Sequence, residues 1–320
     1  MKKQNRLLII LLLFQTCLFA QKIDNTVSFI DIKDVNYFRY NYDNDFFASS
    51  DENYTQGYNF ELVSPYFKKN PINYLFLKPK NSEIKYGLSI EHIGFTPFNI
   101  KSDQIQVGDR PFAAAIMLKS FAIVTDTLNK SRVSSALNIG LIGPGAFGKE
   151  MQVGIHKATG NVIPQGWRHQ IKNDVVLNYE INYEKQLVRY RNLFSLQANT
   201  SAKLGTLFTN ASVGLNATLG IINNAFTSVK NKNKFQIYLY SQPVFTAVGY
   251  DATLQGGLFN TKSPYIISSN SIERFTAQLN YGLVLQTKSL FLEYSRVKLT
   301  KEFETGNAAK YGGIKIGFKF

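Results

Sequence analysis

The 320-residue chain has one cysteine, and beyond its N-terminus it has no apolar run as long as a membrane-spanning helix. Such a helix needs about 20 apolar residues. The cysteine, Cys17, lies in the N-terminal apolar stretch, so the chain from residue 21 onward contains no thiol. Disulfides, thiol catalysis and thiolate metal sites are therefore excluded from that part. The sequence also has no Walker loop, dinucleotide fingerprint or zinc-ligand spacing, which argues against the corresponding nucleotide-dependent and zinc-dependent enzymes.

Acidic residues are few relative to basic ones. The chain has 22 Asp and Glu against 36 Lys and Arg, which gives a formal net charge of +14. An excess of cations indicates an anionic partner, although surface lysines also serve solubility alone. For an exported protein, the phosphates of lipopolysaccharide are a more plausible partner than nucleic acid. We therefore expect no nucleic-acid binding.

The N-terminus has the order of a secretory signal. Met1–Arg6 contains three positive residues, Leu7–Leu13 is an unbroken apolar run, and a small residue follows at Ala20. This pattern predicts a signal peptide over residues 1–20 and one mature domain over residues 21–320. A membrane anchor is the alternative, but the run is short for one. A lipoprotein site at Cys17 is disfavoured because Thr16 is a poor match to the preceding small residue.

Alternation of apolar and polar residues is the main structural signal. In the last segment Ile314, Ile316 and Phe318 alternate with Lys315 and Gly317, which is the period of a strand with one apolar face. The chain ends on an aromatic residue and has 18 Tyr and 25 Phe, as expected for the aromatic girdles of an outer-membrane barrel. The sequence therefore predicts an all-β fold, an antiparallel transmembrane β-barrel of about 12 strands with a short helix in the third extracellular loop.

The predicted strands have the length that a tilted membrane strand needs, about 9–11 residues or more. They are Val35–Asn44, Gln56–Pro65, Glu83–Phe95, Phe112–Thr125, Arg132–Ile142, Asn173–Val188, Asn192–Gly205, Thr209–Ile222, Lys234–Gly249, Glu273–Thr287, Leu290–Thr300 and Tyr311–Phe320. An even number of strands places both termini on the periplasmic side.

This topology puts three polar connections on the outer side. They are Asp43–Gly57, the end of the second loop at Gly108–Ala113, and Gly143–Ile171. Polar groups from three loops at one rim of a rigid scaffold are typical of an active site. Most inner connections are short; Tyr66–Ser82, which is long and rich in lysine, is the exception, and the sequence assigns it no role.

The third outer connection contains a predicted helix. Ala146–Thr159 has helical periodicity and ends at Gly160. Gln152 and His156 are four residues apart and therefore share one face. A histidine in this place can act as a general base, or it can be a structural residue that caps the helix or packs near Trp167.

An ordered set of short motifs runs through these loops. It comprises Asn44-Asp45, Tyr54-Thr55-Gln56-Gly57, Gly108-Asp109-Arg110, Gly143-Pro144, Gln152 to His156, Pro164–Trp167 and Gln170-Ile171-Lys172-Asn173. The set resembles the outer-membrane lipid A 3'-O-deacylase family. The resemblance is dense from about residue 43 to residue 178 and thinner in the C-terminal half. It implies a twelve-stranded barrel in the outer membrane that removes the 3'-linked acyloxyacyl chain of lipid A and needs a calcium ion.

The resemblance also implies roles for single residues. His156 would deprotonate the attacking water, and Asp45 would hold calcium through its oxygen atoms. Asn44 and Thr55 would hydrogen-bond the same centre, and Gln152 would orient the histidine or the water. The implied partners are lipid A and the lipids of the outer membrane, with the protein a monomer and its active-site loops facing outside.

Two basic residues are candidates for the substrate's phosphates. Arg110 would face a phosphate or be a structural partner of Asp109, and Lys101 would bind the sugar-phosphate headgroup. Other barrel functions stay open. An outer-membrane phospholipase would use a His-x-Ser pair, which the residues after His92 and His156 do not supply. A porin or adhesin would give no reason for the histidine helix.

Overall fold

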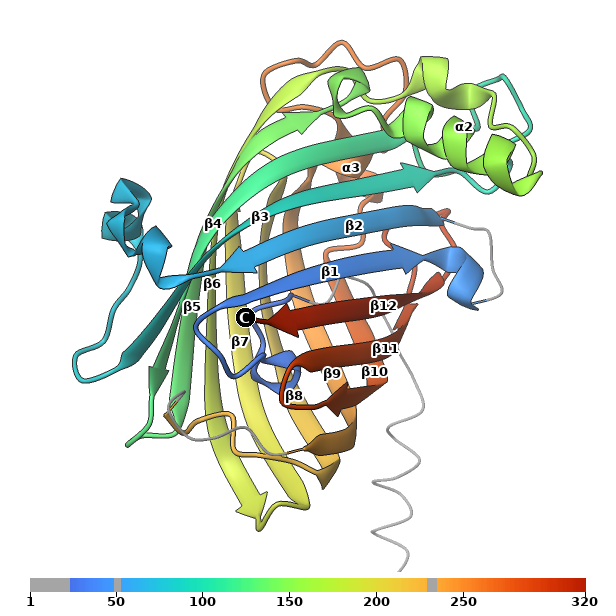
Figure 1. Ribbon diagram of the computed structural model, residues 1–320. Helices are drawn as coiled ribbons and strands as arrows, with labels where there is room; N and C mark the ends of the chain where they lie inside the picture. The colour runs from blue at the N-terminus through green and yellow to red at the C-terminus, as the bar shows by residue number, and fades with distance from the viewer. Residues whose placement is uncertain (1–23, 49–52, 229–234) are drawn as a thin grey trace, which may run out of the picture.

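The computed structural model describes residues 24–48, 53–228 and 235–320, and the predicted signal peptide lies outside these ranges. Within them, twelve antiparallel strands form a closed barrel in which β1 pairs with both β2 and β12 (Figure 1). Closure satisfies the backbone hydrogen bonds of every strand, which a strand in lipid requires. The predicted fold class is confirmed. None of the described helices is long and apolar enough to cross a bilayer.

The observed strand ends lie within a few residues of the predicted ones. The strands are β1 (Tyr37–Asn44), β2 (Asn53–Val63), β3 (Glu83–Thr96), β4 (Ala113–Asp126), β5 (Ser131–Ile142), β6 (Asp174–Tyr190), β7 (Phe194–Gly205), β8 (Phe208–Ile221), β9 (Gln236–Asp251), β10 (Phe275–Gln286), β11 (Leu290–Leu299) and β12 (Lys310–Lys319).

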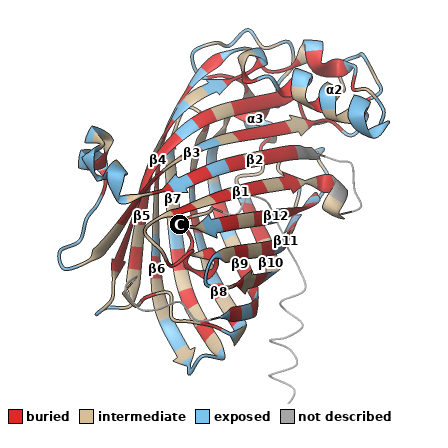
Figure 2. Ribbon diagram, in the orientation of Figure 1, coloured by how far each residue is buried: buried red, intermediate tan, exposed pale blue. Residues whose placement is uncertain are grey.

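Polar side chains face the lumen and apolar side chains face outward. On β12, Lys315 is 1% exposed, and its Nζ lies 2.7 Å from Glu293, which is directly opposite it on the adjacent strand β11. Its neighbours Ile314 and Phe318 are exposed on the outer wall. The burial colours alternate along the strands in the same way (Figure 2). An apolar outer surface is the arrangement expected of a barrel in lipid.

The segment before β1 enters the lumen from the periplasmic end. Its short 3-10 turn η2 (Ser28–Ile30) and Ile32 are buried against aromatic side chains of the wall, including Phe121 and Phe291. Because the sequence analysis assigned no structure before Val35, this plug was not predicted. It occupies the periplasmic part of the barrel interior.

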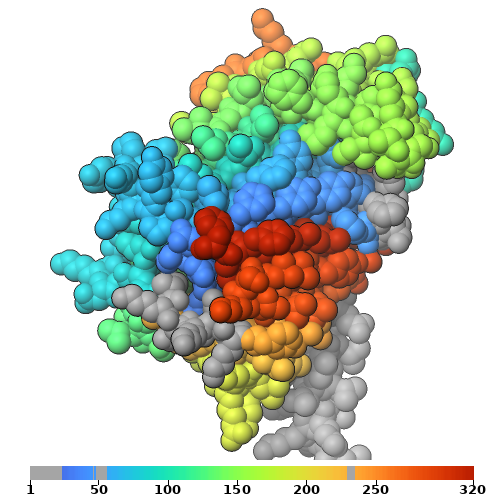
Figure 3. All heavy atoms as spheres, in the orientation of Figure 1, coloured from blue at the N-terminus to red at the C-terminus, as the bar shows by residue number. Residues whose placement is uncertain are grey.

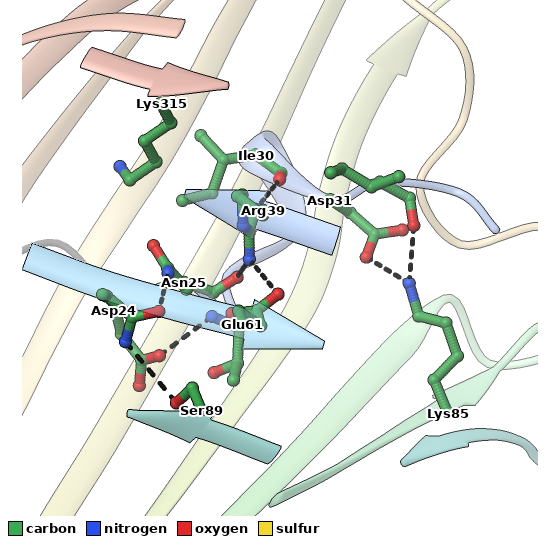
Figure 4. A network of polar contacts seen from close by, with 12 residues as sticks. Asp24, Asn25, Ile30, Asp31, Arg39, Glu61, Lys85, Ser89 and Lys315 are labelled. Carbon is green, nitrogen blue, oxygen red and sulfur yellow. Dashed lines mark hydrogen bonds and ion pairs between the residues drawn. The ribbon is translucent and has the colours of Figure 1, made fainter. Parts of the chain in front are cut away.

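Charged groups of the wall hold the plug in place (Figure 4). The Asp31 carboxylate lies 2.6 Å from both Lys85 of β3 and Arg132 of β5. The Arg39 guanidinium donates to the backbone carbonyl of Ile30 and, at 2.7 Å, to Glu61. Buried charges are stable only when they are paired in this way.

The remaining short helices lie in the connections. At the extracellular end these are η3 (Asp45–Ala48), η6 (Pro144–Ala146), α2 (Gly148–Thr159), η7 (Gly166–His169), α3 (Ala252–Gln255) and η8 (Ser269–Ser271); at the periplasmic end they are η4 (Pro65–Lys69) and η5 (Pro71–Leu75).

Helix α2 begins two residues later than predicted. Phe147 has a φ of 60° and separates η6 from α2, so the helix cannot start at Ala146. Its end is as predicted: Gly160, with a φ of 70°, donates its N–H to the His156 carbonyl. A glycine tolerates this left-handed conformation without steric cost, which explains the helix end.

Candidate functional site

All predicted site residues lie on elements at the extracellular end of the barrel. They are Asn44 at the end of β1, Asp45 in η3, Thr55 in β2, Lys101 and Arg110 between β3 and β4, and Gln152 and His156 in α2. The arrowhead of β1 and helix α2 lie at the same end in Figure 1. The side chain of Thr55 lies outside the described part of the structure.

Strand register places Asn44 on the outer wall. Asn41 and Asp43 are buried and hydrogen-bonded to each other at 3.0 Å on the lumen face. Alternation therefore turns Tyr42 and Asn44 outward, and the Asn44 Nδ2 donates to the Tyr42 hydroxyl at 3.2 Å. Across the sheet Asn44 is opposite Gln56, which is buried. The outer wall thus carries polar groups at the rim, although the rest of that wall is apolar.

His92 joins the β5–β6 connection to this patch. It lies on β3 opposite Tyr58, and the two rings stack with centroids 5.0 Å apart. The His92 Nε2 lies 2.9 Å from the backbone carbonyl of Ala146 in η6. A carbonyl only accepts, so Nε2 carries the proton. The sequence analysis missed this role, since nothing in the local sequence links His92 to a segment 54 residues later.

Helix α2 is fixed by a contact between Gln152 and Trp167. The Trp167 Nε1 donates to the Gln152 Oε1 at 2.6 Å, and both side chains are buried. Trp167 also packs on Phe112 of the β3–β4 connection. Gly148 permits the close approach, because a Cβ there would lie 2.4 Å from the Cβ of Ala114. The helix is therefore packed against the barrel rim.

The same contact decides what Gln152 offers a ligand. Trp167 is a donor only, so the amide oxygen of Gln152 must be its acceptor. The remaining group, Nε2, is buried and has no hydrogen-bond partner. A buried amide donor without a partner is costly unless something accepts from it. Gln152 is thus poised to donate to a water, an imidazole nitrogen or a developing oxyanion.

His156 follows Gln152 by one helical turn and is half-buried. Its Nδ1 is hydrogen-bonded to the backbone carbonyl of Val162, just beyond the helix end. Since that carbonyl can only accept, the proton is on Nδ1, and the Nε2 of a neutral ring is then the proton acceptor. The hydrogen bond also fixes the ring orientation. This contact beyond the helix end is also what a capping histidine makes, while the indole N–H of Trp167 is used by Gln152.

Asp45 and Asn44 supply adjacent oxygen donors at the end of β1. Asp45 opens η3 and is 4% exposed. The described residues contain no group of three or more His, Cys, Asp or Glu side chains able to hold a metal. A cation held by Asp45 would therefore meet at most two such side chains, and its other ligands would be neutral amide, carbonyl or water oxygens. That donor set suits a hard ion such as calcium and does not suit zinc.

Arg110 lies inside the rim. It is 1% exposed, forms an ion pair with Glu302, donates to the Thr253 hydroxyl at 2.7 Å and lies 4.0 Å from the ring centre of Phe95. Asp109, the structural partner expected for Arg110, contacts its backbone: the Asp109 carboxylate accepts from the Arg110 N–H at 2.6 Å, while the guanidinium pairs with Glu302. Burial raises the pKa of Glu302, and Arg110 opposes that rise. The guanidinium joins three extracellular connections.

Lys101 is exposed on the β3–β4 connection. The same connection reaches η7 through Asp103, whose carboxylate pairs with Arg168 at 3.0 Å. Lys101 is thus held near the rim on a loop that is tied to the histidine-bearing connection, while its ammonium stays in solvent.

A cavity in the barrel interior is separate from this site. It has a volume of about 90 Å³ and lies in the lumen, with polar lining residues that include Glu91, Glu180 and Lys203. No predicted site residue lines it. The cavity is therefore not part of the candidate site, whose residue Asn44 lies on the outer wall and whose residue Arg110 lies inside the rim.

Comparisons with known proteins agree with this description. The family model described as outer membrane protein LpxR matches residues 7–320. Among solved structures, LpxR from Salmonella typhimurium is similar with a TM-score of 0.73 and 19% sequence identity, covering 89% of this chain and 100% of that one. The β domain of the Bordetella autotransporter Brka has a TM-score of 0.45 and 8% identity, covering 89% and 98%. No curated protein sequence matches the chain.

Proposed function

Because the chain belongs to the family of outer membrane protein LpxR, we propose that it is a lipid A 3'-O-deacylase, an ester hydrolase that removes the 3'-linked acyloxyacyl chain. The protein is an outer-membrane β-barrel, and its candidate site is at the extracellular rim on the lipid-facing side of the wall. Lipid A occupies the outer leaflet at that level. The observation that carries the proposal is the imidazole of His156, whose Nδ1 is hydrogen-bonded to a carbonyl.

In the proposed reaction His156 is the general base. Its Nε2 takes a proton from water, and the oxygen of that water attacks the ester carbonyl carbon. The tetrahedral intermediate then expels the 3' sugar oxygen, which receives the proton from the imidazolium. The products are a free acyloxyacyl acid and a sugar hydroxyl. The hydrogen bond to Val162 favours this role because it keeps the ring in one tautomer.

Gln152 is proposed to act beside His156. Its Nε2 is the buried donor that lacks a partner in the protein. Donation from this group would position the attacking water or stabilise the negative charge that forms on the carbonyl oxygen. The hydrogen bond from Trp167 to the amide oxygen fixes the orientation of the Gln152 amide, so that Nε2 points away from the indole.

Calcium is the proposed cofactor, held by Asp45 and Asn44, with Thr55 as a further hydrogen-bonding group of the centre. When bound, the ion would polarise the ester carbonyl and offset its developing charge. Lys101 is exposed and is proposed to contact a phosphate of the sugar headgroup. Arg110 stabilises the rim through its ion pair with Glu302. A contact between Arg110 and a phosphate would be made in addition to that ion pair.

Two other barrel functions are less well supported. A phospholipase of the His-x-Ser type lacks its serine here, since His156 is followed by Lys157 and Ala158. A porin needs an open lumen, whereas residues such as Ile30 and Asp31 occupy it.

Mass spectrometry of lipid A tests the proposal. Lipid A is extracted from cells with and without the gene, and purified protein is incubated with hexa-acylated lipid A with calcium or with a chelator. Loss of the 3' acyloxyacyl chain in the presence of the active protein is expected. Unchanged lipid A, together with fatty-acid release from glycerophospholipid or faster uptake of small solutes, would overturn it.

A further inference from the structure

The periplasmic connection between β2 and β3, residues 64–82, has a defined secondary structure. It contains η4 and η5, each with a proline in its first turn. The Ser64 hydroxyl accepts from the Tyr66 N–H at 3.4 Å, and the Asn70 side chain accepts from the Ile72 N–H at 3.0 Å. Caps of this kind satisfy the N–H groups at a helix start and fix the path of the chain.

This connection packs against the outside of the barrel. Phe76 is 5% exposed and is buried against Tyr86 of β3 and Ala122 of β4. Ala122 lies on the outer wall, because its neighbours Phe121 and Ile123 face the lumen and pack with the plug. The chain leaving β2 therefore turns back along the lipid-facing wall.

Two hydrogen bonds to the same wall hold it there. The Asn70 Nδ2 donates to the Ser120 hydroxyl of β4 at 3.1 Å, and the Tyr179 hydroxyl of β6 donates to the Leu75 carbonyl at 2.9 Å. A soluble domain would project away from the membrane at this place. Here the connection is fixed to four neighbouring strands of the wall, β3 to β6, through Phe76 and these bonds.

Its exposed side is both apolar and basic. Tyr66 is 75% exposed, Tyr74 is 89% exposed, and Leu75 and Leu77 are more than half exposed. Four exposed lysines lie among them, and residues 65–82 contain no acidic residue; the lysines are Lys68, Lys69, Lys78 and Lys80. The element is largely pale blue in Figure 2 and protrudes at the left of the barrel, in sky-blue atoms, in Figure 3.

We propose that this connection is a docking surface for anionic phospholipid headgroups of the periplasmic leaflet. Tyrosine and leucine are suited to the interfacial layer, and lysines near a membrane surface are attracted to anionic lipid. The strands β3 and β4, which it covers, continue into the lipid-facing surface at Ile90 and Leu118, and both of these side chains are about half exposed. The surface is thus continuous with the membrane-contacting wall. The proposal rests on the barrel's place in the outer membrane and not on ester hydrolysis.

Site-directed spin labelling measures whether the surface meets lipid. The full chain carrying Cys17→Ser has no other cysteine, so Tyr74→Cys gives one label position. Leu128→Cys is the matched control, since Leu128 is 79% exposed in the β4–β5 turn at the same end. Both labelled proteins are placed in vesicles of phosphatidylethanolamine with phosphatidylglycerol. Collisions with oxygen and with a water-soluble nickel chelate are recorded.

We expect the label at position 74 to collide more with oxygen and less with nickel than the label at position 128. Equal nickel accessibility at the two positions would overturn the proposal. The surface would then be one that faces the periplasm and can bind a soluble partner. The heat-modifiable gel shift of each variant shows that the barrel is folded before labelling.

The lysines are tested by charge exchange. Replacing all four by glutamine should lower the preference for phosphatidylglycerol over phosphatidylethanolamine, read by native mass spectrometry of bound lipid, by at least about tenfold, because each lysine near an anionic surface is worth about a fivefold factor. Replacing all four by arginine keeps the charge and should keep the preference. An unchanged preference in the glutamine variant would contradict the role of the lysines.

Discussion

The indole nitrogen of Trp167 donates to the amide oxygen of Gln152 over 2.6 Å, and this single contact determines which end of the glutamine is left over. The indole comes from η7 and the amide from α2, so the contact also ties the two halves of the β5–β6 connection together. The donor that remains, Nε2, is buried and has no partner. The hydrogen bond between Trp167 and Gln152 therefore leaves the Nε2 donor of Gln152 available to a ligand.

Replacing Trp167 by phenylalanine removes the indole donor while keeping an aromatic ring against Phe112. Gln152 then has no fixed orientation, and we expect kcat for lipid A deacylation to fall on the order of tenfold with little change in KM. Gln152→Glu keeps an acceptor for Trp167 but removes the Nε2 donor, so its kcat should fall further. Steady-state assays of purified protein in mixed micelles measure both. Wild-type activity in Gln152→Glu would show that the donor takes no part.

His156→Ala should lower ester cleavage by about 10²–10⁴-fold, the range that general-base catalysis contributes. The variant should still show the heat-modifiable gel shift of a folded barrel. His169→Ala is a matched control, because His169 is at the same rim and its Nε2 contacts the Asp103 backbone carbonyl. If His156→Ala cleaves lipid A at the wild-type rate, another group is the base.

Asp45→Ala should raise the calcium concentration for half-maximal activity by at least about tenfold, since a carboxylate is the strongest oxygen ligand available to this ion. Activity is titrated with buffered calcium. Asp126→Ala, at the last residue of β4 and the opposite end of the barrel, should keep the wild-type midpoint. Were Asp45→Ala to lose activity in chelator at that same midpoint, Asp45 would not be a ligand.

Arg110→Met should destabilise the barrel in a pH-dependent way. Removal of one partner leaves the largely buried Glu302, 20% exposed, without its cation, which costs up to about 3–5 kcal/mol. Burial already raises the pKa of Glu302, and loss of Arg110 raises it further. A carboxyl whose pKa is raised by folding favours the folded state when protonated. The destabilisation should therefore be small at low pH and grow as the pH rises through the folded-state pKa.

Urea unfolding of the protein in lipid vesicles, followed by the gel shift, measures this effect at about pH 5 and about pH 8. The double variant Arg110→Met with Glu302→Gln has no carboxyl to titrate and should show little pH dependence. A deficit of equal size at both pH values in Arg110→Met would mean that Glu302 is not the group responsible.

The strands could be predicted because their signal is local. In β12 the polarity of each residue indicates which face of the sheet it lies on, because side chains alternate between the two faces: Ile314 faces lipid and Lys315 faces the lumen. The outer rim followed from the even strand count alone. The end of α2 at Gly160 was also readable, because a glycine permits the left-handed residue that a helix end needs.

Partners distant in sequence could not be predicted. Arg110 meets Glu302, 192 residues later, and no local pattern near Arg110 distinguishes that partner from Asp109. His92 meets the Ala146 carbonyl, and every residue has a carbonyl. The start of α2 was missed because Phe147 adopts a conformation that is uncommon for a residue with a side chain. The plug has no alternation, so its burial depends entirely on the wall around it.

The plug also bears on conductance. Asp31, clamped between Lys85 and Arg132, lies where a passage would otherwise open to the periplasm. A solute or ion that crossed the barrel would have to displace this segment and separate both ion pairs. The protein should therefore conduct few ions despite its barrel fold.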